Sequence, residues 1–310
     1  MSAVLGAKRR RAGARGGLRP VWEEEPRPAG LAAKALVLAL ACGAVLFPLW
    51  IVVVTSLSSV RTITQAGGLV VVPRGVTLVA YQELLGGGQV TRAALVSVGV
   101  TVTGTLVSMT VSVLCAYGLS RGGSVLHRPL LMVLLATMFF GAGLIPTYLL
   151  VQGLGLTDTY LSLILPSAVN VFNILVLRSF FMGVAPELID SARIDGAGDA
   201  RILWRIVMPL SRAVLAVIAL FYAVGYWSAW FNASIYLSDQ DMMPLQNVMM
   251  QLVLKQERPT GLAQAINTGH LSPLSVQMAV MVLALVPVAV LSPFVQRHFR
   301  KGMLTGAVKG

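Results

Sequence analysis

Charged side chains are scarce in this sequence: they make up 12% of its 310 residues, while hydrophobic residues make up 56%. A soluble domain carries about 25% charged residues. The mean hydropathy of +0.79 points the same way. Because the chain has too little polar surface to cover a water-facing shell, lipid must be the solvent for much of it. This composition excludes an ordinary soluble enzyme.

Groups that carry catalysis or bind metals are also few. The two cysteines, Cys42 and Cys115, lie in apolar runs with no His or Cys at ligand spacing, which argues against a disulfide framework and a metal site. The sequence contains no G-x-x-x-x-G-K-[ST], so it does not bind ATP as a P-loop protein does. A membrane-embedded enzyme would need clustered acids and histidines, and no such cluster is present. We therefore predict that this chain is not an enzyme.

Six windows without Asp, Glu, Lys or Arg are each long enough for a helix of about 20 residues, the length that crosses a bilayer. The predicted spans are 35–57, 94–119, 129–151, 159–177, 213–237 and 274–296. Each is expected to be continuous, because an unpaired backbone group in lipid costs several kcal/mol. Prolines within the spans should kink them locally. The predicted fold class is an all-α membrane protein with six transmembrane helices.

Lysine and arginine are distributed unevenly between the segments that join these spans. With the N-terminus inside, the inner segments hold 19 of the 24 basic residues and the outer segments hold 5. This asymmetry predicts an N-in, C-in orientation. It also accounts for the net charge of +12 without a nucleic-acid partner. Residues 1–30 are predicted to be a mobile basic cytoplasmic tail, and residues 31–310 to form the six-helix domain.

The inner segment 178–212 contains the strongest local pattern. Pro186, followed by Glu187 in the first turn, predicts the start of a helix. Gly196 then permits a sharp change of direction, and a second short helix is expected to end near Pro209. We expect a helix–turn–helix elbow at the membrane surface. It is either a loop lying on lipid headgroups or a docking site for a cytoplasmic partner.

This segment resembles the EAA loop of permease subunits of binding-protein-dependent ABC importers. The family pattern is Glu-Ala-Ala, three residues, Gly, nine residues, Ile, one residue, Leu-Pro. The same spacing occurs here in Asp190-Ser191-Ala192, Gly196 and Ile206-Val207-Met208-Pro209, with Asp, Ser and Met as mild departures. Residues 193–197, 225–232 and 235–237 look like the carbohydrate-uptake branch, related to the maltose transporter permeases. Residues 301–310 look like a sub-branch linked to oligosaccharides and uronic-acid or polysaccharide fragments.

The resemblance implies a permease subunit of an ATP-driven importer that moves a carbohydrate, in particular an oligosaccharide, into the cytoplasm across a bacterial cytoplasmic membrane. The implied partners are a second homologous permease, two cytoplasmic ATPase subunits, an extracytoplasmic sugar-binding protein and membrane lipid. Mg-ATP is implied in the ATPase subunits, and no cofactor is implied in this chain. The residues implied to couple to the ATPase are Glu187, Asp190, Ser191, Ala192, Arg193, Asp195, Gly196, Ile206 and Pro209.

Within the elbow, Leu188 and Ala192 lie four residues apart and can line one apolar face. Asp195 has two interpretations. Its carboxylate either belongs to the docking surface or forms a local ion pair with Arg193 or Arg201.

Uncharged polar and aromatic side chains within the spans are candidates for a sugar pathway. They are Asn170, Asn173, Trp227, Trp230 and Asn232. Sugars present hydroxyls and apolar C–H faces, which amides and flat aromatic rings suit. Alternatives stay open: the asparagines could bond neighbouring helices, and the aromatic residues could belong to interfacial belts. A partner permease could also carry most of the sugar contacts.

Two other transporters fit the same spans. A secondary transporter would normally place an ionisable residue within a span, and no Asp, Glu, Lys or Arg lies in the six predicted ones. An ABC permease for a non-sugar solute would share the fold, although the carbohydrate-like C-terminus argues against it. For the long outer segment 238–273, the resemblance implies a reach toward the binding protein, and the alternative is a plain connecting loop.

Overall fold

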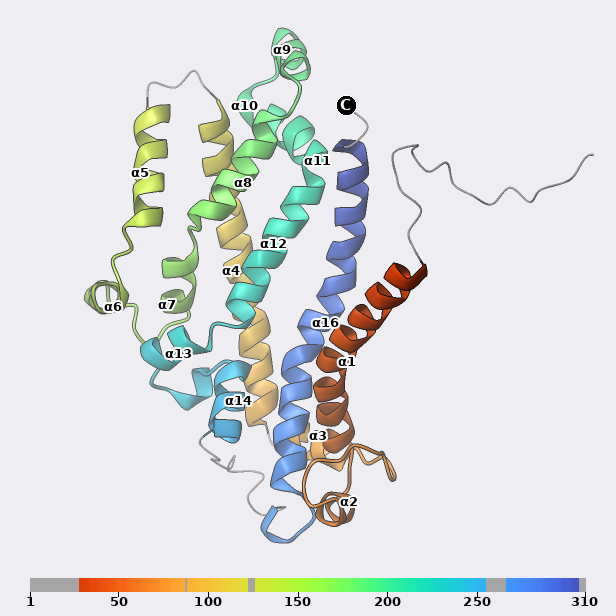
Figure 1. The fold of residues 1–310 in the computed structure, drawn as a ribbon. Coiled ribbons are helices and arrows are strands. Elements are labelled where there is room, and N and C mark those ends of the chain that lie inside the picture. The colour runs from red at the N-terminus through yellow and green to blue at the C-terminus, as the bar shows by residue number, and fades with distance from the viewer. Residues whose placement is uncertain (1–27, 87, 122–125, 255–265, 307–310) are drawn as a thin grey trace, which may run out of the picture. The chain divides into compact units, whose positions relative to one another are not determined.

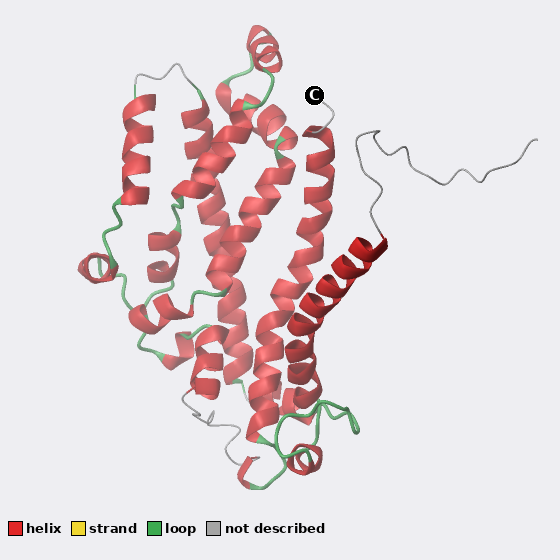
Figure 2. Cartoon of the chain, in the orientation of Figure 1, coloured by secondary structure: helices red, strands yellow, loops and turns green. Residues whose placement is uncertain are grey.

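The computed structural model describes residues 28–86, 88–121, 126–254 and 266–306, and every regular element in these ranges is a helix (Figures 1 and 2). The chain divides into two units, Met1–Leu49 and Trp50–Gly310, and the boundary falls within α1 (Pro28–Ser56). The predicted tail, residues 1–30, lies almost wholly outside the described residues.

The second unit contains the remaining helices. They are α2 (Val60–Gln65), α3 (Val79–Gly86), α4 (Gln89–Ser120), α5 (His127–Phe139), α6 (Leu144–Gly153), α7 (Leu161–Ile164), α8 (Val171–Met182), α9 (Pro186–Ile194), α10 (Asp199–Ile202), α11 (Met208–Leu210), α12 (Arg212–Trp227), α13 (Trp230–Tyr236), α14 (Leu245–Leu254) and α16 (Pro273–Gly306). Leu165–Ser167 (η1) and Gln240–Met242 (η3) are 3₁₀ turns, and Leu203–Val207 (η2) is a π-helical stretch between α10 and α11.

Among the described residues, three helices are long and apolar enough to cross a membrane: α1, α4 and α16. Three bent pairs would each add one span. They are His127–Phe139 with Leu144–Gly153, bent by 116°, Leu161–Ser167 with Val171–Met182, bent by 52°, and Asp199–Leu210 with Arg212–Trp227, bent by 87°. An all-α fold with membrane-length helices is confirmed. The number six and the N-in, C-in orientation stay predictions.

The prediction of continuous helices is wrong for three spans. The span 129–151 breaks between α5 and α6, where Gly143 has φ 83°, a left-handed conformation that residues with a Cβ rarely adopt. The span 213–237 ends early at Trp227, and a new helix begins at Trp230. Absence of charge marks where lipid can be the solvent, but it does not show where the backbone changes direction.

The third break interrupts the span 159–177 after η1. The side-chain oxygen of Asn170 accepts a hydrogen bond from the backbone N–H of Asn173 at 3.1 Å, which caps the first turn of α8. An N-cap asparagine satisfies a donor that would otherwise lack a partner. Asn170 is therefore the start of a new helix, not the interior of one.

α4 packs along both α8 and α12 (Figure 1), and the surface it presents to α12 is made of small residues. Gly104, Ser108 and Ser112 are spaced four apart and are all buried, so they share one face. A Cβ added at Gly104 would lie 2.8 Å from the Tyr226 ring. Small residues at this spacing let two membrane helices approach closely. The Ser108 hydroxyl then reaches the Tyr226 hydroxyl at 2.7 Å, and the Ser112 hydroxyl reaches the Tyr222 hydroxyl at 2.6 Å.

Gly104→Ala is expected to destabilise the protein by about 1–3 kcal/mol, because the added methyl pushes the Tyr226 ring away from α4. The midpoint temperature of unfolding in detergent, followed by size-exclusion chromatography, measures this. The control is Gly99→Ala on the same helix, where an added Cβ meets nothing within 4 Å. Equal losses in the two variants would contradict the close approach of α4 and α12.

Candidate functional site

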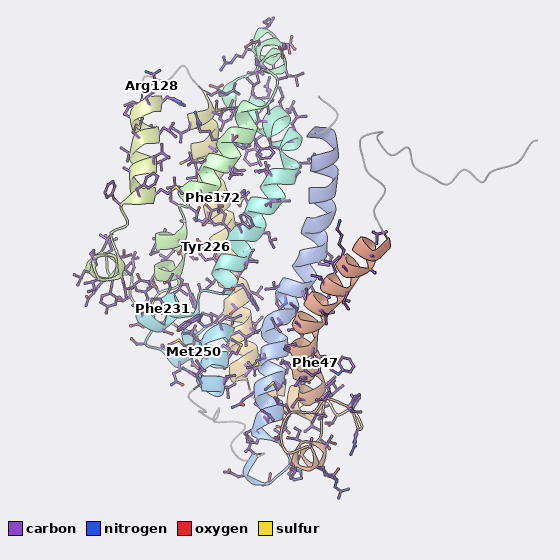
Figure 3. The ribbon with its side chains drawn as sticks, in the orientation of Figure 1. Phe47, Arg128, Phe172, Tyr226, Phe231 and Met250 are labelled. Carbon is purple, nitrogen blue, oxygen red and sulfur yellow. The ribbon has the colours of Figure 1, made fainter. Side chains whose placement is uncertain are left out.

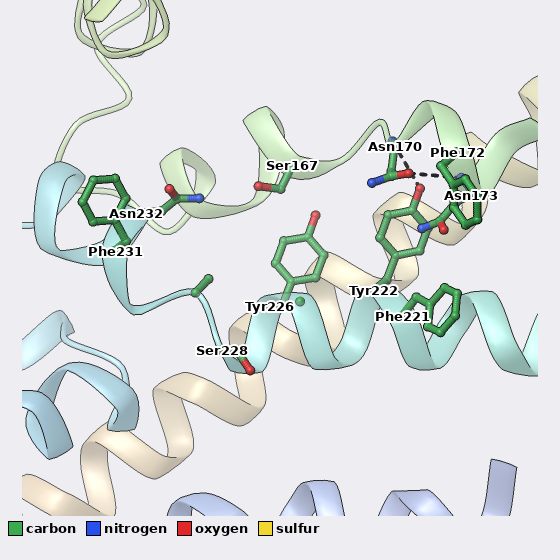
Figure 4. A pocket seen from close by; sticks show the side chains of 12 residues that line it. Ser167, Asn170, Phe172, Asn173, Phe221, Tyr222, Tyr226, Ser228, Phe231 and Asn232 are labelled. Atoms are coloured by element: carbon green, nitrogen blue, oxygen red, sulfur yellow. Dashed lines mark hydrogen bonds between the residues drawn. The ribbon is translucent and has the colours of Figure 1, made fainter. Parts of the chain in front are cut away.

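A cavity of about 480 Å³ lies between the α7–α8 segment and the α12–α13 segment (Figure 4). Its lining residues share one property: all are uncharged. They are Ser167, Asn170, Phe172, Asn173, Phe221, Tyr222, Gly225, Tyr226, Ser228, Ala229, Phe231 and Asn232. Figure 3 shows Phe172, Tyr226 and Phe231 on α8, α12 and α13, the three helices that bring aromatic rings to this cavity.

Two tyrosines form a fixed wall of the cavity. The Tyr226 hydroxyl donates to the backbone carbonyl of Ile164 at 3.1 Å, so Ser108 donates the bond that joins it to Tyr226. The Tyr222 hydroxyl accepts a bond from the backbone N–H of Asn170 at 3.3 Å and also pairs with Ser112. Because both hydroxyls are engaged within the protein, these tyrosines offer mainly their ring faces to a ligand.

Other polar groups on the lining are not engaged. Asn173 is only 4% exposed, yet its side-chain amide has no hydrogen-bond partner among the described residues. Within the same ranges, the side chains of Ser167, Ser228 and Asn232 also have none. Because the Asn173 amide lines the cavity and is not paired within the described residues, it is available to bind water or a ligand there. The cavity combines such groups with aromatic rings, an arrangement suited to a neutral ligand with hydroxyls and apolar faces.

The predicted pathway residues separate into two groups. Asn170, Asn173 and Asn232 line the cavity together. Trp227 does not: its indole N–H donates to the carbonyl of Ala284 on α16 at 2.9 Å, and its ring is buried in the core. Trp230 is also absent from the lining, and its ring stands edge-on to Phe231. The expectation of one shared helix for Trp227, Trp230 and Asn232 is wrong, because α12 ends at Trp227.

Sequence reasoning missed all of the cavity's aromatic and hydroxyl residues. Tyr222 and Tyr226 carried a usable signal, since they are spaced four apart in an apolar run and so share a face of α12. Phe221 carried the same signal, because it stands four residues before Gly225 on α12. Ser167, Ser228, Phe172 and Phe231 carried none, and they stand next to helix ends that the composition of the run does not reveal.

The predicted elbow is present at the end of α8. α9 begins with Pro186, carries Glu187 in its first turn, and ends before Gly196, whose φ is 78°. The backbone N–H of Ala197 returns to the carbonyl of Ala192 at 2.9 Å, which closes the turn. The second arm, α10–η2–α11, ends at Leu210, one residue after Pro209.

Side chains of the elbow divide between the core and the surface. Ile189 is buried, and Ala192 and Ile206 are partly buried against the core, so these residues anchor the elbow to its own chain. Leu188 is 48% exposed and Ile194 is 87% exposed. The face predicted for Leu188 and Ala192 is thus divided: Ala192 packs inward while Leu188 faces outward.

The remaining predicted coupling residues also lie on the outside of the elbow. The exposed ones are Glu187, Asp190, Ser191, Arg193, Asp195 and Gly196, while Pro209 is partly buried. Arg193 pairs with Asp199, at 3.4 Å, and not with Asp195. Within the described ranges no ion pair involves Asp195, so its carboxylate is available at the surface.

A short chain of hydrogen bonds ties the elbow to the end of α4. The Tyr117 hydroxyl donates to Asp199, at 3.1 Å to its backbone carbonyl and 3.4 Å to its carboxylate. Arg121 donates to the Tyr117 hydroxyl at 3.0 Å and lies over the same ring. α4 thus contacts the elbow at its C-terminal end and the cavity's two tyrosines near its middle.

Tyr117→Phe is expected to loosen the elbow, because Asp199 loses its donor from α4. One such bond is worth about 0.5–1.5 kcal/mol, so amide hydrogen exchange across 186–200 should become roughly two- to tenfold faster. Exchange followed by mass spectrometry measures this. Tyr148→Phe is the matched control, since the Tyr148 ring stacks on Tyr236 and no hydrogen bond of its hydroxyl is observed in the described residues. Unchanged exchange in Tyr117→Phe would contradict the tie.

The structure combines three features of a membrane transport subunit. It has apolar helices of membrane length, a cavity with an uncharged lining between the α7–α8 and α12–α13 segments, and an exposed elbow between α8 and α12. Residues 45–305 match the family described as "Binding-protein-dependent transport system inner membrane component", and the chain belongs to this family. The resemblance seen in the EAA-like loop is therefore confirmed at the level of the family.

Curated relatives and solved structures agree with this assignment. The chain is 40% identical to the polygalacturonan/rhamnogalacturonan transport system permease protein YtcP of Bacillus subtilis, over 89% of this chain and 95% of that protein. It is 30% identical to the arabinooligosaccharides transport system permease protein AraQ of Halalkalibacterium halodurans, over 58% of this chain and 60% of that protein. A chain of a bacterial ABC transporter involved in the import of the acidic polysaccharide alginate matches with a TM-score of 0.83 and 29% identity, covering 91% of this chain and 100% of that one.

Proposed function

We propose that this chain is the membrane-spanning permease subunit of an ATP-driven importer that moves an oligosaccharide into the cytoplasm. The observation that carries the sugar part of the proposal is the cavity lined by unpartnered neutral side chains. The Asn173 side chain has no hydrogen-bond partner among the described residues and lines this cavity, so its amide is available to groups that enter the cavity. Sugar hydroxyls supply partners of this kind.

The cavity's size and aromatic content fit the same ligand. Its volume of about 480 Å³ lies within the range of small-molecule sites. Phe172, Phe221 and Phe231 offer flat apolar surfaces on which the C–H face of a sugar ring can pack. The lining has no cation to pair with an acidic group. This chain therefore contacts the hydroxyls and ring faces of the sugar at this point, whether or not the sugar carries carboxylates elsewhere.

The proposed partner subunits are an ATPase pair, a second permease and a binding protein. The sequence has no P-loop pattern, and the family implies two separate cytoplasmic ATPase subunits that bind and hydrolyse Mg-ATP. The exposed elbow, with Leu188, Ile194 and Asp195 on its outer side, is the surface that docks them. A second permease completes the pathway, an extracytoplasmic binding protein delivers the sugar, and the assembly lies in the bacterial cytoplasmic membrane with six spans, N-in and C-in.

Replacing cavity amides with leucine should slow sugar uptake. Asn173→Leu and Asn232→Leu each remove hydrogen-bonding groups at similar side-chain size, and the double variant should lose about tenfold in uptake. The measurement is ATP-driven uptake of labelled galacturonan- and arabinan-derived oligosaccharides by proteoliposomes that contain the complete transporter. Gln152→Leu, at an exposed position on α6 away from the cavity, is the control. Wild-type uptake in the double variant would contradict the cavity's role.

Ile194→Glu should release the ATPase while the second permease stays bound, because it places a charge on the exposed apolar tip of the elbow without touching the core. Co-purification in mild detergent measures both partners. Val76→Glu is the control, at another exposed apolar position that lies before α3 in the outer segment. Gly196→Asp, at the φ 78° turn, should have the same effect as Ile194→Glu.

Two results would count against this assignment. If the ATPase remains bound to both elbow variants, the elbow is not the docking surface. If the wild-type chain purifies alone and transports sugar without ATP, the protein is a secondary transporter.

A further inference from the structure

The second arm of the elbow is nearly perpendicular to α12, the helix that follows it. Asp199–Leu210, here called the in-plane segment, is bent by 87° relative to Arg212–Trp227. When α12 crosses the membrane, a segment at this angle to it runs nearly parallel to the bilayer surface. The segment stands at the end of α12, where the hydrocarbon core gives way to headgroups. Figure 1 shows α10 and α11 between the tip of α9 and the upper end of α12.

The in-plane segment has two different faces. Ile202, Leu203 and Val207 are almost completely buried and hold it against the core. Arg201, Trp204 and Arg205 are exposed, and their spacing of three and four residues places them together on the opposite side. Trp204 is 64% exposed, which is unusual for a large aromatic ring on a surface that faces only water. Buried aliphatic residues therefore oppose an exposed face of arginine and tryptophan.

This exposed face carries positive charge that the protein does not neutralise. Within the described ranges, neither Arg201 nor Arg205 has an ion pair, and the same holds for Arg212, which is exposed at the start of α12. The one acid of the in-plane segment, Asp199, already accepts hydrogen bonds from Arg193 and Tyr117. Three guanidinium groups are thus free to bind an anion.

We propose that the exposed face of the in-plane segment binds the anionic phospholipid headgroups of the leaflet at this end of α12. Guanidinium groups pair with phosphate oxygens through two parallel hydrogen bonds, and a tryptophan ring settles at the headgroup level. An amphipathic helix that lies in the interface and is rich in Arg and Trp has the same combination of charge and geometry. This lipid site does not depend on which solute is transported, because it requires only that α12 crosses the membrane.

The neighbouring helix α9 has a different chemistry, which separates the two surfaces of the elbow. Its outer side carries the acids Glu187 and Asp190, with Asp195 at its C-cap and exposed Leu188 and Ile194. The exposed cation of α9, Arg193, is paired with Asp199. The in-plane segment presents cations and a tryptophan. An anionic lipid surface complements the second face and repels the first, so the elbow can hold the membrane with one arm and leave the other free in the cytoplasm.

The test compares the transporter, purified with its partners, in nanodiscs of phosphatidylcholine alone and in nanodiscs containing phosphatidylglycerol. The probe is phosphatidylglycerol, and its apparent affinity is taken from the rise in unfolding temperature as its fraction increases. Each arginine near an anionic surface lowers the dissociation constant about fivefold. The apparent dissociation constant for phosphatidylglycerol should therefore rise on the order of twentyfold in R201Q/R205Q. Arg201→Lys with Arg205→Lys should restore most of the affinity, because the charge is kept.

The matched control is R61Q/R74Q, which removes two exposed arginines from the outer segment. Its phosphatidylglycerol affinity should equal that of the wild type. A second readout uses phosphatidylglycerol with brominated acyl chains, which should quench tryptophan fluorescence less in Trp204→Phe than in the wild type.

Three results would overturn the proposal. The first is an unchanged phosphatidylglycerol affinity in R201Q/R205Q. The second is an equal loss in R61Q/R74Q, which would mean that any exposed arginine pair suffices. The third is loss of the ATPase or the second permease from R201Q/R205Q with lipid affinity intact, which would assign this face to a protein partner. Sugar uptake and ATPase binding are measured separately in the elbow and cavity variants, so failure of the lipid site and failure of the importer assignment are distinguishable.

Discussion

The close approach of α4 to α12 is the contact on which the rest of the structure depends. Gly104 leaves no room for a Cβ beside the Tyr226 ring, and Ser108 and Ser112 hold the two tyrosine hydroxyls of α12. In lipid there is little hydrophobic gain from bringing apolar helices together, so packing and buried hydrogen bonds must supply the association. Here both come from one row of small residues on α4.

That contact fixes the cavity as well as the core. Tyr222 and Tyr226 face α4 with their hydroxyls and the cavity with their rings, and Asn170 donates its backbone N–H to Tyr222. In the last turn of the same helix, Tyr117 bonds the elbow through Asp199. α4 therefore contacts both the candidate sugar site and the candidate docking surface. If a movement at the docking surface displaces α4 as a rigid unit, the wall of the cavity moves with it, and the reverse also holds. Coupling between two sites requires a shared element of this kind.

Much of this organisation could be predicted from the sequence, because lipid imposes simple rules. Absence of charge located the membrane-length apolar helices α1, α4 and α16, and the order Pro186, Gly196, Pro209 predicted both arms of the elbow. The breaks within three spans could not be predicted in this way, since they depend on Gly143 adopting a positive φ, on Asn170 capping α8, and on α12 ending at Trp227. The breaks at Asn170 and after Trp227 adjoin the cavity. Asn173 and Asn232 were found by residue type, whereas Trp227 and Trp230 were misplaced.

The breaks also explain why polar groups can line a cavity within a membrane protein at low cost. A continuous helix satisfies its own backbone, but an interrupted one leaves donors and acceptors that must be paired by neighbouring groups. In this chain Tyr226 binds the carbonyl of Ile164, and Tyr222 binds the N–H of Asn170, so the two tyrosines of α12 satisfy the backbone on both sides of the break between η1 and α8. The side chains beside that break are then free to face the cavity. The helix break between η1 and α8 thus accounts for both the irregular backbone and the polar lining beside it. The tyrosines that pair this backbone are held in place by the row of small residues that lets α12 lie against α4.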